Sequence, residues 1–292
     1  MSAPDQAFVV TVASGKGGTG KTTVATSLAL TAPGPALYAD CDVEEPNGGL
    51  FLQPVIDRQE VFESLVPTVD AERCAGCGTC QEVCAFNAIH LLGKPVVFPE
   101  HCHSCGACIE LCPEHALGER KVRRGALAFG RRNGLAFIEG RLDVGQIAAS
   151  PLIRAVRQAA DAQQNTGAGR YVVADASPGV ACPVMTAALG ADYLLLVTEP
   201  TPLGAHDLDR ALTLGRTMGL RTGIVLNRSG SGDDALVEEV AASHGAAILA
   251  RLPFDRRIAT AYAEGRLLVE ACPEFEEQFA GLWKAIIEEK QR

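Results

Sequence analysis

Apolar runs of strand length alternate with helix-forming segments along most of the chain. Residues 8–13 and 36–40 are short apolar runs, and residues 21–31 between them are rich in alanine and leucine. An apolar run without polar alternation is typical of a parallel strand that is buried on both faces. The first 66 residues are therefore predicted to form strand, loop, helix and strand.

The same alternation resumes in the second half of the chain. Strands are predicted at residues 171–174, 193–198, 223–226 and 247–252, and helices near residues 203–218, 233–244 and 273–290. Alternating strands and helices imply a parallel sheet that is covered on both faces. We therefore expect an α/β fold with a doubly wound, mainly parallel sheet.

Residues 67–120 break this pattern, because they are rich in cysteine, glycine and proline and show little helical periodicity. Four cysteines recur there at a constant offset, so that Cys74, Cys77, Cys80 and Cys84 return as Cys102, Cys105, Cys108 and Cys112. This repeat indicates a duplicated metal-binding half. We predict a small α+β insert at residues 67–120 that interrupts one domain formed by residues 1–66 and 121–292.

Composition and charge narrow the function classes. No apolar run reaches the roughly 18 residues of a membrane span, and residues 1–6 lack the basic region of a signal peptide, so we expect a cytoplasmic protein without a stable membrane anchor. The 11 cysteines then indicate metal rather than disulfides, because the cytosol keeps thiols reduced. The net charge of −9 argues against nucleic-acid binding.

One local basic run has two interpretations. It comprises Lys121, Arg123, Arg124, Arg131 and Arg132 and contains no acidic residue. The first interpretation is a solvated hairpin. The second is a docking surface for an acidic partner or for the acidic insert beside it.

A phosphate-binding loop follows the first predicted strand and precedes the first predicted helix. Residues 15–22 match G-x-x-x-x-G-K-[ST] at every position. Glycines let backbone N–H groups turn toward phosphate oxygens, and the helix N-terminus adds partial positive charge. Lys21 can reach the β- and γ-phosphates, and Thr22 can bind Mg²⁺. We expect an ATPase that binds ATP, ADP and Mg²⁺ through Gly15, Lys16, Gly17, Gly18, Thr19, Gly20, Lys21, Thr22 and Thr23.

A second lysine inside the loop, Lys16, resembles the deviant P-loop of the MinD/Mrp family, which includes the nitrogenase iron protein. In that family the early lysine crosses a dimer interface to the partner's nucleotide. The resemblance implies a catalytic Lys16 that acts in trans and a nucleotide-dependent dimer, either a homodimer or a heterodimer with a related ATPase. The alternative for Lys16 is a solvated surface lysine.

Further motifs extend the resemblance over most of the chain. Residues 40–47 look like the family's switch I, in which Asp42 would orient water or Mg²⁺, and residues 175–179 look like switch II, in which Asp175 would be the carboxylate linked to Mg²⁺ directly or indirectly. Lys16, Lys21, Asp42 and Asp175 are thus the implied catalytic residues. The alternative for the two aspartates is a helix-capping role. Segments similar to the family's adenine-binding segments contain Asn227, Arg228, Pro253, Phe254 and Asp255.

Both cysteine runs fit the bacterial ferredoxin spacing C-x₂-C-x₂-C-x₃-C, in which the fourth cysteine ligates the other cluster. We therefore expect two [4Fe–4S] clusters, the first on Cys74, Cys77, Cys80 and Cys112 and the second on Cys102, Cys105, Cys108 and Cys84. The first run ends in Ala85 where the stricter pattern has proline. Zinc is the competing metal, but its sites usually pair two C-x₂-C knuckles across a longer spacer.

Cys182 falls seven residues after Asp175, an offset that resembles the nitrogenase iron protein, whose dimer shares one cluster. It either contacts a transferred metal or cluster, or it is a buried structural thiol. The favoured function is ATP-dependent assembly or delivery of a metal cofactor or iron–sulfur cluster to a partner protein. An ATP-gated electron donor to a redox partner is the alternative. A MinD-like positioning ATPase is less favoured, because the last helix is acidic where a membrane-surface helix would be basic.

Overall fold

The computed structural model describes residues 7–164 and 169–291, and its centre is one large twisted sheet. In the described part of the chain the strand order is β11-β10-β9-β1-β8-β2-β7-β6-β3. Neighbours from β11 to β7 run parallel, and β6 and β3 add antiparallel strands at one edge. The parallel strands are β1 Phe8–Ala13, β2 Ala36–Cys41, β7 Leu135–Leu142, β8 Tyr171–Ala176, β9 Tyr193–Thr198, β10 Thr222–Ser229 and β11 Ala247–Pro253. The expected mainly parallel α/β sheet is confirmed.

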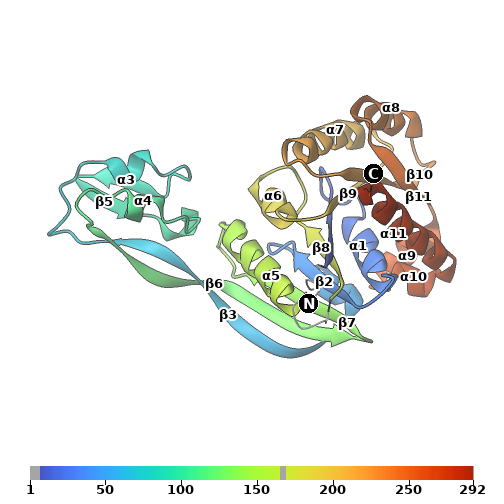
Figure 1. The fold of residues 1–292 in the computed structure, drawn as a ribbon, viewed down its shortest axis with the longest axis horizontal. Helices are drawn as coiled ribbons and strands as arrows, with labels where there is room; N and C mark the ends of the chain where they lie inside the picture. The colour runs from blue at the N-terminus through green and yellow to red at the C-terminus, as the bar shows by residue number, and fades with distance from the viewer. Residues whose placement is uncertain (1–6, 165–168, 292) are drawn as a thin grey trace.

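Helices cover both faces of this sheet (Figure 1). One apolar core lies under α5 Ala149–Gln164, α6 Cys182–Ala188, α7 Pro202–Thr217 and α8 Asp234–His244. The second core lies under α1 Lys21–Leu30, α2 Gly48–Leu52, α9 Arg256–Ala263, α10 Leu268–Ala271 and α11 Glu276–Gln291. The strands and helices expected outside residues 67–120 are present with ends shifted by a few residues; α11 begins after a short 3₁₀ turn at Pro273–Phe275.

A long two-stranded ribbon was not predicted from the sequence. Strand β3, Val55–Val69, pairs antiparallel with β6, Leu117–Arg132, along its whole length. Strand β6 also pairs with β7 and so joins the ribbon to the main sheet. Figure 1 shows the ribbon running out from the body of the molecule to a small unit made of residues 70–116.

The unit at the end of the ribbon has two matching halves. Its elements are the short helices α3 Thr79–Glu82 and α4 Ala107–Glu110, the hairpin β4 Ile89–Leu92 with β5 Lys94–Val97, and a 3₁₀ turn at Pro99–His101. Each helix follows a glycine with positive φ, at Gly78 and Gly106. Asn87 and His115, at the same offset as the cysteines, also have positive φ. The sequence repeat is therefore also a repeat of backbone conformation.

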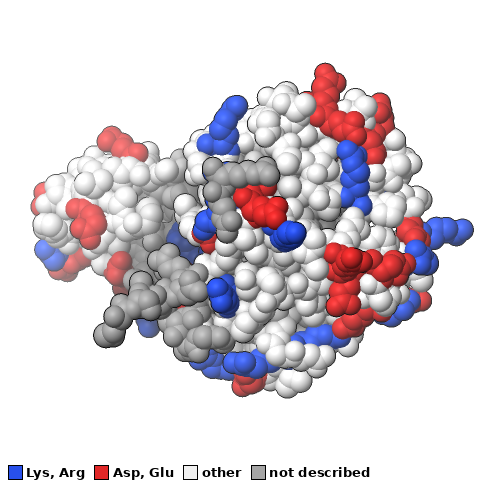
Figure 2. All heavy atoms as spheres, turned by 45° about the vertical axis from the view of Figure 1, so that its right-hand side comes forward, with Lys and Arg blue, Asp and Glu red and all other residues white. Residues whose placement is uncertain are grey.

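The basic run lies on β6 and does not form a uniformly solvated surface. Arg124 is only 1% exposed, and its guanidinium donates to Ser64 Oγ at 2.8 Å and to the Pro99 carbonyl at 2.6 Å. Its neighbour Arg123 pairs with Asp143 at the surface. The solvated interpretation is wrong for Arg124, which contacts the cysteine-rich unit directly. Figure 2 shows that the visible surface of this unit carries Asp and Glu side chains and few Lys or Arg side chains.

Among the helices that the structure describes, none has both the length and the apolar character needed to cross a bilayer.

Candidate functional site

The phosphate-binding loop occupies the turn between β1 and α1, at the carboxyl edge of the sheet. Gly20 precedes the helix with φ 89°, and a Cβ at this position would lie 2.2 Å from Asn227 Nδ2. Asn227, on β10, donates from Nδ2 to the Thr19 carbonyl at 2.7 Å. A side chain at residue 20 would therefore be strained in its backbone and would displace Asn227, which fastens the loop.

A cavity of about 370 Å³ opens above this loop. The predicted nucleotide residues that line it are Gly17, Gly18, Gly20, Lys21, Thr22, Thr23, Asp42, Asn227, Arg228, Pro253, Phe254 and Asp255. Gly15, Lys16, Thr19 and Asp175 were also predicted but do not line it. Glu45, Asn47 and Pro178, which belong to the two expected switch segments, also line it, and sequence reasoning missed Ser14, Ile258, Ala259 and Tyr262, which do as well. Aromatic side chains at Phe254 and Tyr262 are exposed at the cavity and can pack on a flat base.

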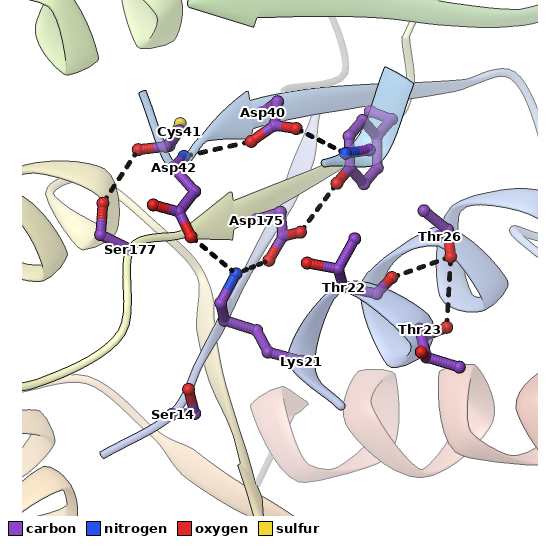
Figure 3. A network of polar contacts seen from close by, with 12 residues as sticks. Ser14, Lys21, Thr22, Thr23, Thr26, Asp40, Cys41, Asp42, Asp175 and Ser177 are labelled. Carbon is purple, nitrogen blue, oxygen red and sulfur yellow. Dashed lines mark hydrogen bonds and ion pairs between the residues drawn. The ribbon is translucent and has the colours of Figure 1, made fainter. Parts of the chain in front are cut away.

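Two carboxylates pair with Lys21 beneath the cavity, Asp42 just after β2 and Asp175 on β8, and Asp40 on β2 lies next to them (Figure 3). Lys21 Nζ donates to Asp175 Oδ1 at 2.6 Å and lies 3.6 Å from Asp42 Oδ2. Tyr38 donates its hydroxyl to the other oxygen of Asp175 at 2.7 Å. Asp40 accepts hydrogen bonds from the backbone N–H groups of Asp42 and Gly48. Asp40 therefore accepts from the first N–H group of α2, whereas Asp42 faces Lys21.

Burial dominates the electrostatics of this cluster. Burial raises the pKa of Asp42 to about 6, although Lys21 opposes the shift. Burial, together with the charge of Asp175, raises the pKa of Asp40 well above its usual range. Burial alone would lower the pKa of Lys21, but Asp175 and Asp42 outweigh it, so the pKa of Lys21 is raised. The lysine is thus a fixed cation held by carboxylates, and incoming phosphate oxygens must compete with them for its charge.

Lys16 lies in the loop but does not line the cavity. It forms a salt bridge with Glu199 at the end of β9, and its side chain is 24% exposed. Arg228 Nη1 donates to the other oxygen of Glu199 at 2.7 Å. Glu199 was not singled out from the sequence, because no motif marks it, yet it joins the two cations that flank the loop.

The eight repeated cysteines divide into two sets of four, and each set lines its own cavity. One cavity is lined by Cys74, Cys77, Cys80 and Cys112, and the other by Cys84, Cys102, Cys105 and Cys108. The fourth cysteine of each run thus lies with the first three of the other run, as the ferredoxin spacing predicts. Backbone N–H groups of Ala88 and Ala116 donate to Cys84 Sγ and Cys112 Sγ at 3.2 and 3.3 Å.

Each cavity offers four cysteine thiols, which is the donor set that a [4Fe–4S] cluster takes. Among the described residues, no three His, Cys, Asp or Glu side chains converge closely enough to hold one metal ion. Four thiolates of a [4Fe–4S] cluster instead bind four different irons and so stand around a volume. N–H groups directed at sulfur are also among the features that adjust the electronics of such clusters. The residues present therefore suit the expected clusters.

Cys182 begins α6 and lies at a groove between the cysteine-rich unit and the body of the molecule. The groove has a volume of about 520 Å³ and is lined by Phe86, His103, Ser104, Cys105, Ser150, Arg154, Cys182, Met185, Thr186 and Leu189. Cys182 is exposed, so its interpretation as a buried structural thiol is wrong. Cys182 and Cys105, one of the expected cluster ligands, thus line the same groove.

A parallel sheet with this phosphate-binding loop after β1 and acidic residues after β2 and β8 defines a P-loop nucleotide-binding protein. More specifically, residues 10–269 match the CobQ/CobB/MinD/ParA nucleotide binding domain, and the chain belongs to that family. MinD and ParA members of the family are P-loop ATPases, which supports the expected ATPase activity.

Two curated relatives and several solved structures are similar to the chain. The uncharacterized protein MJ0578 of Methanocaldococcus jannaschii is 31% identical over 226 residues, which cover 76% of this chain and 78% of the relative. MinD of Pyrococcus horikoshii, solved with Mg-ADP, has a TM-score of 0.59 at 20% identity, covering 96% of both chains. The cell division ATPase MinD of Pyrococcus furiosus has a TM-score of 0.60 at 21% identity, covering 97% of this chain and 99% of that one. These structural likenesses establish the fold.

Proposed function

We propose that this chain hydrolyses ATP and carries two [4Fe–4S] clusters, and that nucleotide-driven dimer switching serves the assembly or delivery of a metal cofactor or iron–sulfur cluster. The division of eight cysteines between two cavities, with the fourth cysteines exchanged, carries the proposal. In this proposal residues 67–120 are a small α+β ferredoxin-like insert, and residues 1–66 and 121–292 form the ATPase domain. Its partners are a second ATPase subunit and an acceptor protein.

At the nucleotide site, Lys21 leaves the carboxylates to bind the β- and γ-phosphates. With Lys21 on the phosphates, Asp175 would hold Mg²⁺ directly or through water, and the Thr22 hydroxyl would be a second ligand. The ion would supply positive charge to offset that of the phosphates. Asp42, which lines the cavity, orients the attacking water. The adenine packs near Phe254 and Pro253, and Asn227 keeps the loop in shape.

Lys16 completes the site of the partner subunit. It must leave Glu199 to do so, and it then places a cation beside charge that develops on the transferred phosphoryl group. In this proposal hydrolysis requires two subunits, because each site takes its second lysine from the other. The state of the dimer then reports whether ATP or ADP is bound, as in other P-loop switches.

The groove beside α6 is the proposed delivery site. It offers the Cys182 thiol and the Met185 thioether, which are soft donors suited to iron–sulfur or other thiophilic metal cargo. Cys105, an expected ligand of the second cluster, lines the same groove. This position also favours the second candidate function, an ATP-gated electron donor, because an electron acceptor in the groove would lie beside that cluster.

The experiment begins with anaerobic purification and cluster reconstitution. We expect about eight irons and eight acid-labile sulfides per chain, as two [4Fe–4S] clusters require, and we expect Cys112→Ser to lower both contents. Cys272→Ser is the matched control. Cys272 is buried in the apolar core of the ATPase domain and lines neither cysteine cavity. Zinc without labile sulfide, or failure to bind nucleotide, would contradict the proposal.

A second step separates delivery from electron transfer. The loaded protein is mixed with an apo iron–sulfur acceptor or with a one-electron acceptor, in the presence of ATP or a non-hydrolysable analogue. Transfer of iron that requires hydrolysis supports delivery. Nucleotide-gated reduction without loss of iron from the donor supports the electron-donor function.

A further inference from the structure

The two halves of the cysteine-rich unit differ in the cation that each receives. The Cys74 carbonyl accepts a hydrogen bond from Lys94 Nζ at 2.6 Å. The corresponding carbonyl of Cys102 accepts one from Arg124 Nη2 at 3.4 Å. Lys94 is exposed to solvent, whereas Arg124 is 1% exposed. Water screens the charge of Arg124 less than the charge of Lys94, although Glu100 lies close enough to act on Arg124.

Arg124 is held in a single position by three chain segments. Its guanidinium donates to Ser64 Oγ on β3 and to the Pro99 carbonyl in the cysteine-rich unit. It also donates to Gln146 Oε1 at 2.7 Å, in the segment between β7 and α5. An arginine fork satisfied on every side keeps its orientation, so its charge acts from a fixed place.

A short chain of backbone hydrogen bonds connects this arginine to switch I. Leu142 N donates to the Val43 carbonyl at 2.9 Å, and Val43 follows Asp42 in the sequence. The next residue, Asp143, donates its N–H to the Arg124 carbonyl at 2.8 Å. Two hydrogen bonds and one peptide unit therefore separate switch I from the residue that contacts Cys102. These direct contacts form a route by which a displacement of residues 42–43 would reach Arg124.

We propose that Arg124 is a positioning residue that raises the reduction potential of the cluster held by Cys84, Cys102, Cys105 and Cys108 above that of the other cluster and makes that potential respond to the nucleotide at switch I. The inference rests on the proposed function, because it requires clusters and nucleotide. Reduction adds one negative charge to a cluster, and a buried fixed cation stabilises the reduced form more than a screened one.

The test is an anaerobic redox titration of the loaded full-length protein, followed by electron paramagnetic resonance. In the wild type we expect two midpoint potentials, one for each cluster. Their equilibrium constants for reduction should differ by more than tenfold, which corresponds to 59 mV for one electron. Cys105→Ser and Cys77→Ser, at matching positions of the two halves, assign each signal to its cluster. A non-hydrolysable ATP analogue should shift the midpoint of the second cluster and leave the first in place.

Arg124→Gln should lower the higher midpoint potential, so that the equilibrium constant for reduction of that cluster falls at least tenfold. It should also abolish the response of that potential to the analogue. The matched control is Arg123→Gln, which removes the adjacent surface arginine and should change neither midpoint. Two coincident midpoints in the loaded wild type, or a loaded Arg124→Gln variant with wild-type midpoints, would overturn the inference while leaving the proposed function intact. A wild type without clusters or nucleotide binding would refute the proposed function itself. If Arg124→Gln fails to load, the wild-type midpoints alone decide.

Discussion

Replacing Lys21 with alanine should destabilise the nucleotide-free protein in addition to weakening phosphate binding. Lys21 is the cation that balances Asp175, and this pair is buried, with side chains 8% and 1% exposed. Asp40 and Asp42 face the same lysine. The substitution leaves three carboxylates close together without a cation, in a position from which water is largely excluded.

The magnitude follows from the burial of the pair. Removing one partner of a buried ion pair typically costs about 3–5 kcal/mol, because the other charge stays buried. Asp175 keeps the hydrogen bond from the Tyr38 hydroxyl, so we expect a loss near the lower end, about 3 kcal/mol. For a chain of this size that loss corresponds to a fall in the melting temperature of about 6–12 °C.

Urea unfolding at pH 8, without nucleotide or Mg²⁺, measures this loss through the single tryptophan. Trp283 is buried and donates its indole N–H to the Leu28 carbonyl on α1, so it reports on the helix that follows the phosphate-binding loop. Lys21→Ala/Asp175→Asn should recover most of the lost stability, because it removes the unpaired charge. Lys16→Ala is the matched control, since its salt bridge with Glu199 is partly exposed and should cost less than about 1 kcal/mol. A Lys21→Ala protein as stable as the control would refute the reasoning.

Further variants test other parts of the site. Burial raises the pKa of Asp42 from 3.8 to about 6. The folded chain therefore binds this proton more tightly than the unfolded chain does, and the stability that the proton adds is lost as the pH rises from 4 to 6. Asp42→Asn should remove this fall in the free energy of unfolding between pH 4 and 6, which is at most about 3 kcal/mol, and an unchanged pH profile would contradict this. The same variant should abolish ATP hydrolysis. Lys16→Ala should bind ATP but not hydrolyse it, and normal turnover would disprove its action in trans. Cys182→Ser should retain clusters and ATPase activity but lose metal delivery, which an acceptor assay measures. Gly20→Ala should lower both stability and ATP affinity, as calorimetry would show, since its Cβ would meet Asn227.

The parts of the structure that depend on local patterns were predictable from the sequence. Buried parallel strands are apolar runs, and the phosphate-binding loop needs glycines at set positions, so both leave a direct record in the residue order. The cysteine spacing is also visible in the sequence, because only a few spacings between cysteines let the backbone place them around one small cavity. The division of the eight cysteines between the two cavities agrees with the sets expected from that spacing.

The features that depend on long-range contacts were not predictable. Strand β3 contains charged residues such as Arg58 and Glu63, because much of its surface faces solvent, so it lacks the apolar run of a buried strand. Burial of Arg124 requires Ser64, Pro99 and Gln146 to meet it from three segments. Glu199 gains its importance only from the position of Lys16, a partner that is distant in sequence. No short sequence motif identifies such residues, because their contacts are with segments that are distant in the sequence.

The point at which the cysteine-rich unit leaves the sheet has a mechanical consequence. Strand β2 ends in switch I and lies parallel to β7, while β7 carries β6 and therefore the ribbon. The unit is thus joined to switch I through hydrogen-bonded strands and not through a flexible linker, which would absorb small displacements. A Cβ at Gly140 on β7 would lie 2.9 Å from Val43 Cγ1, so switch I is packed closely against the same strand. In the proposed function, a movement of residues 42–43 on nucleotide binding would either displace β7 and the ribbon or break this packing, and the first route leads to Arg124 and the second cysteine cavity.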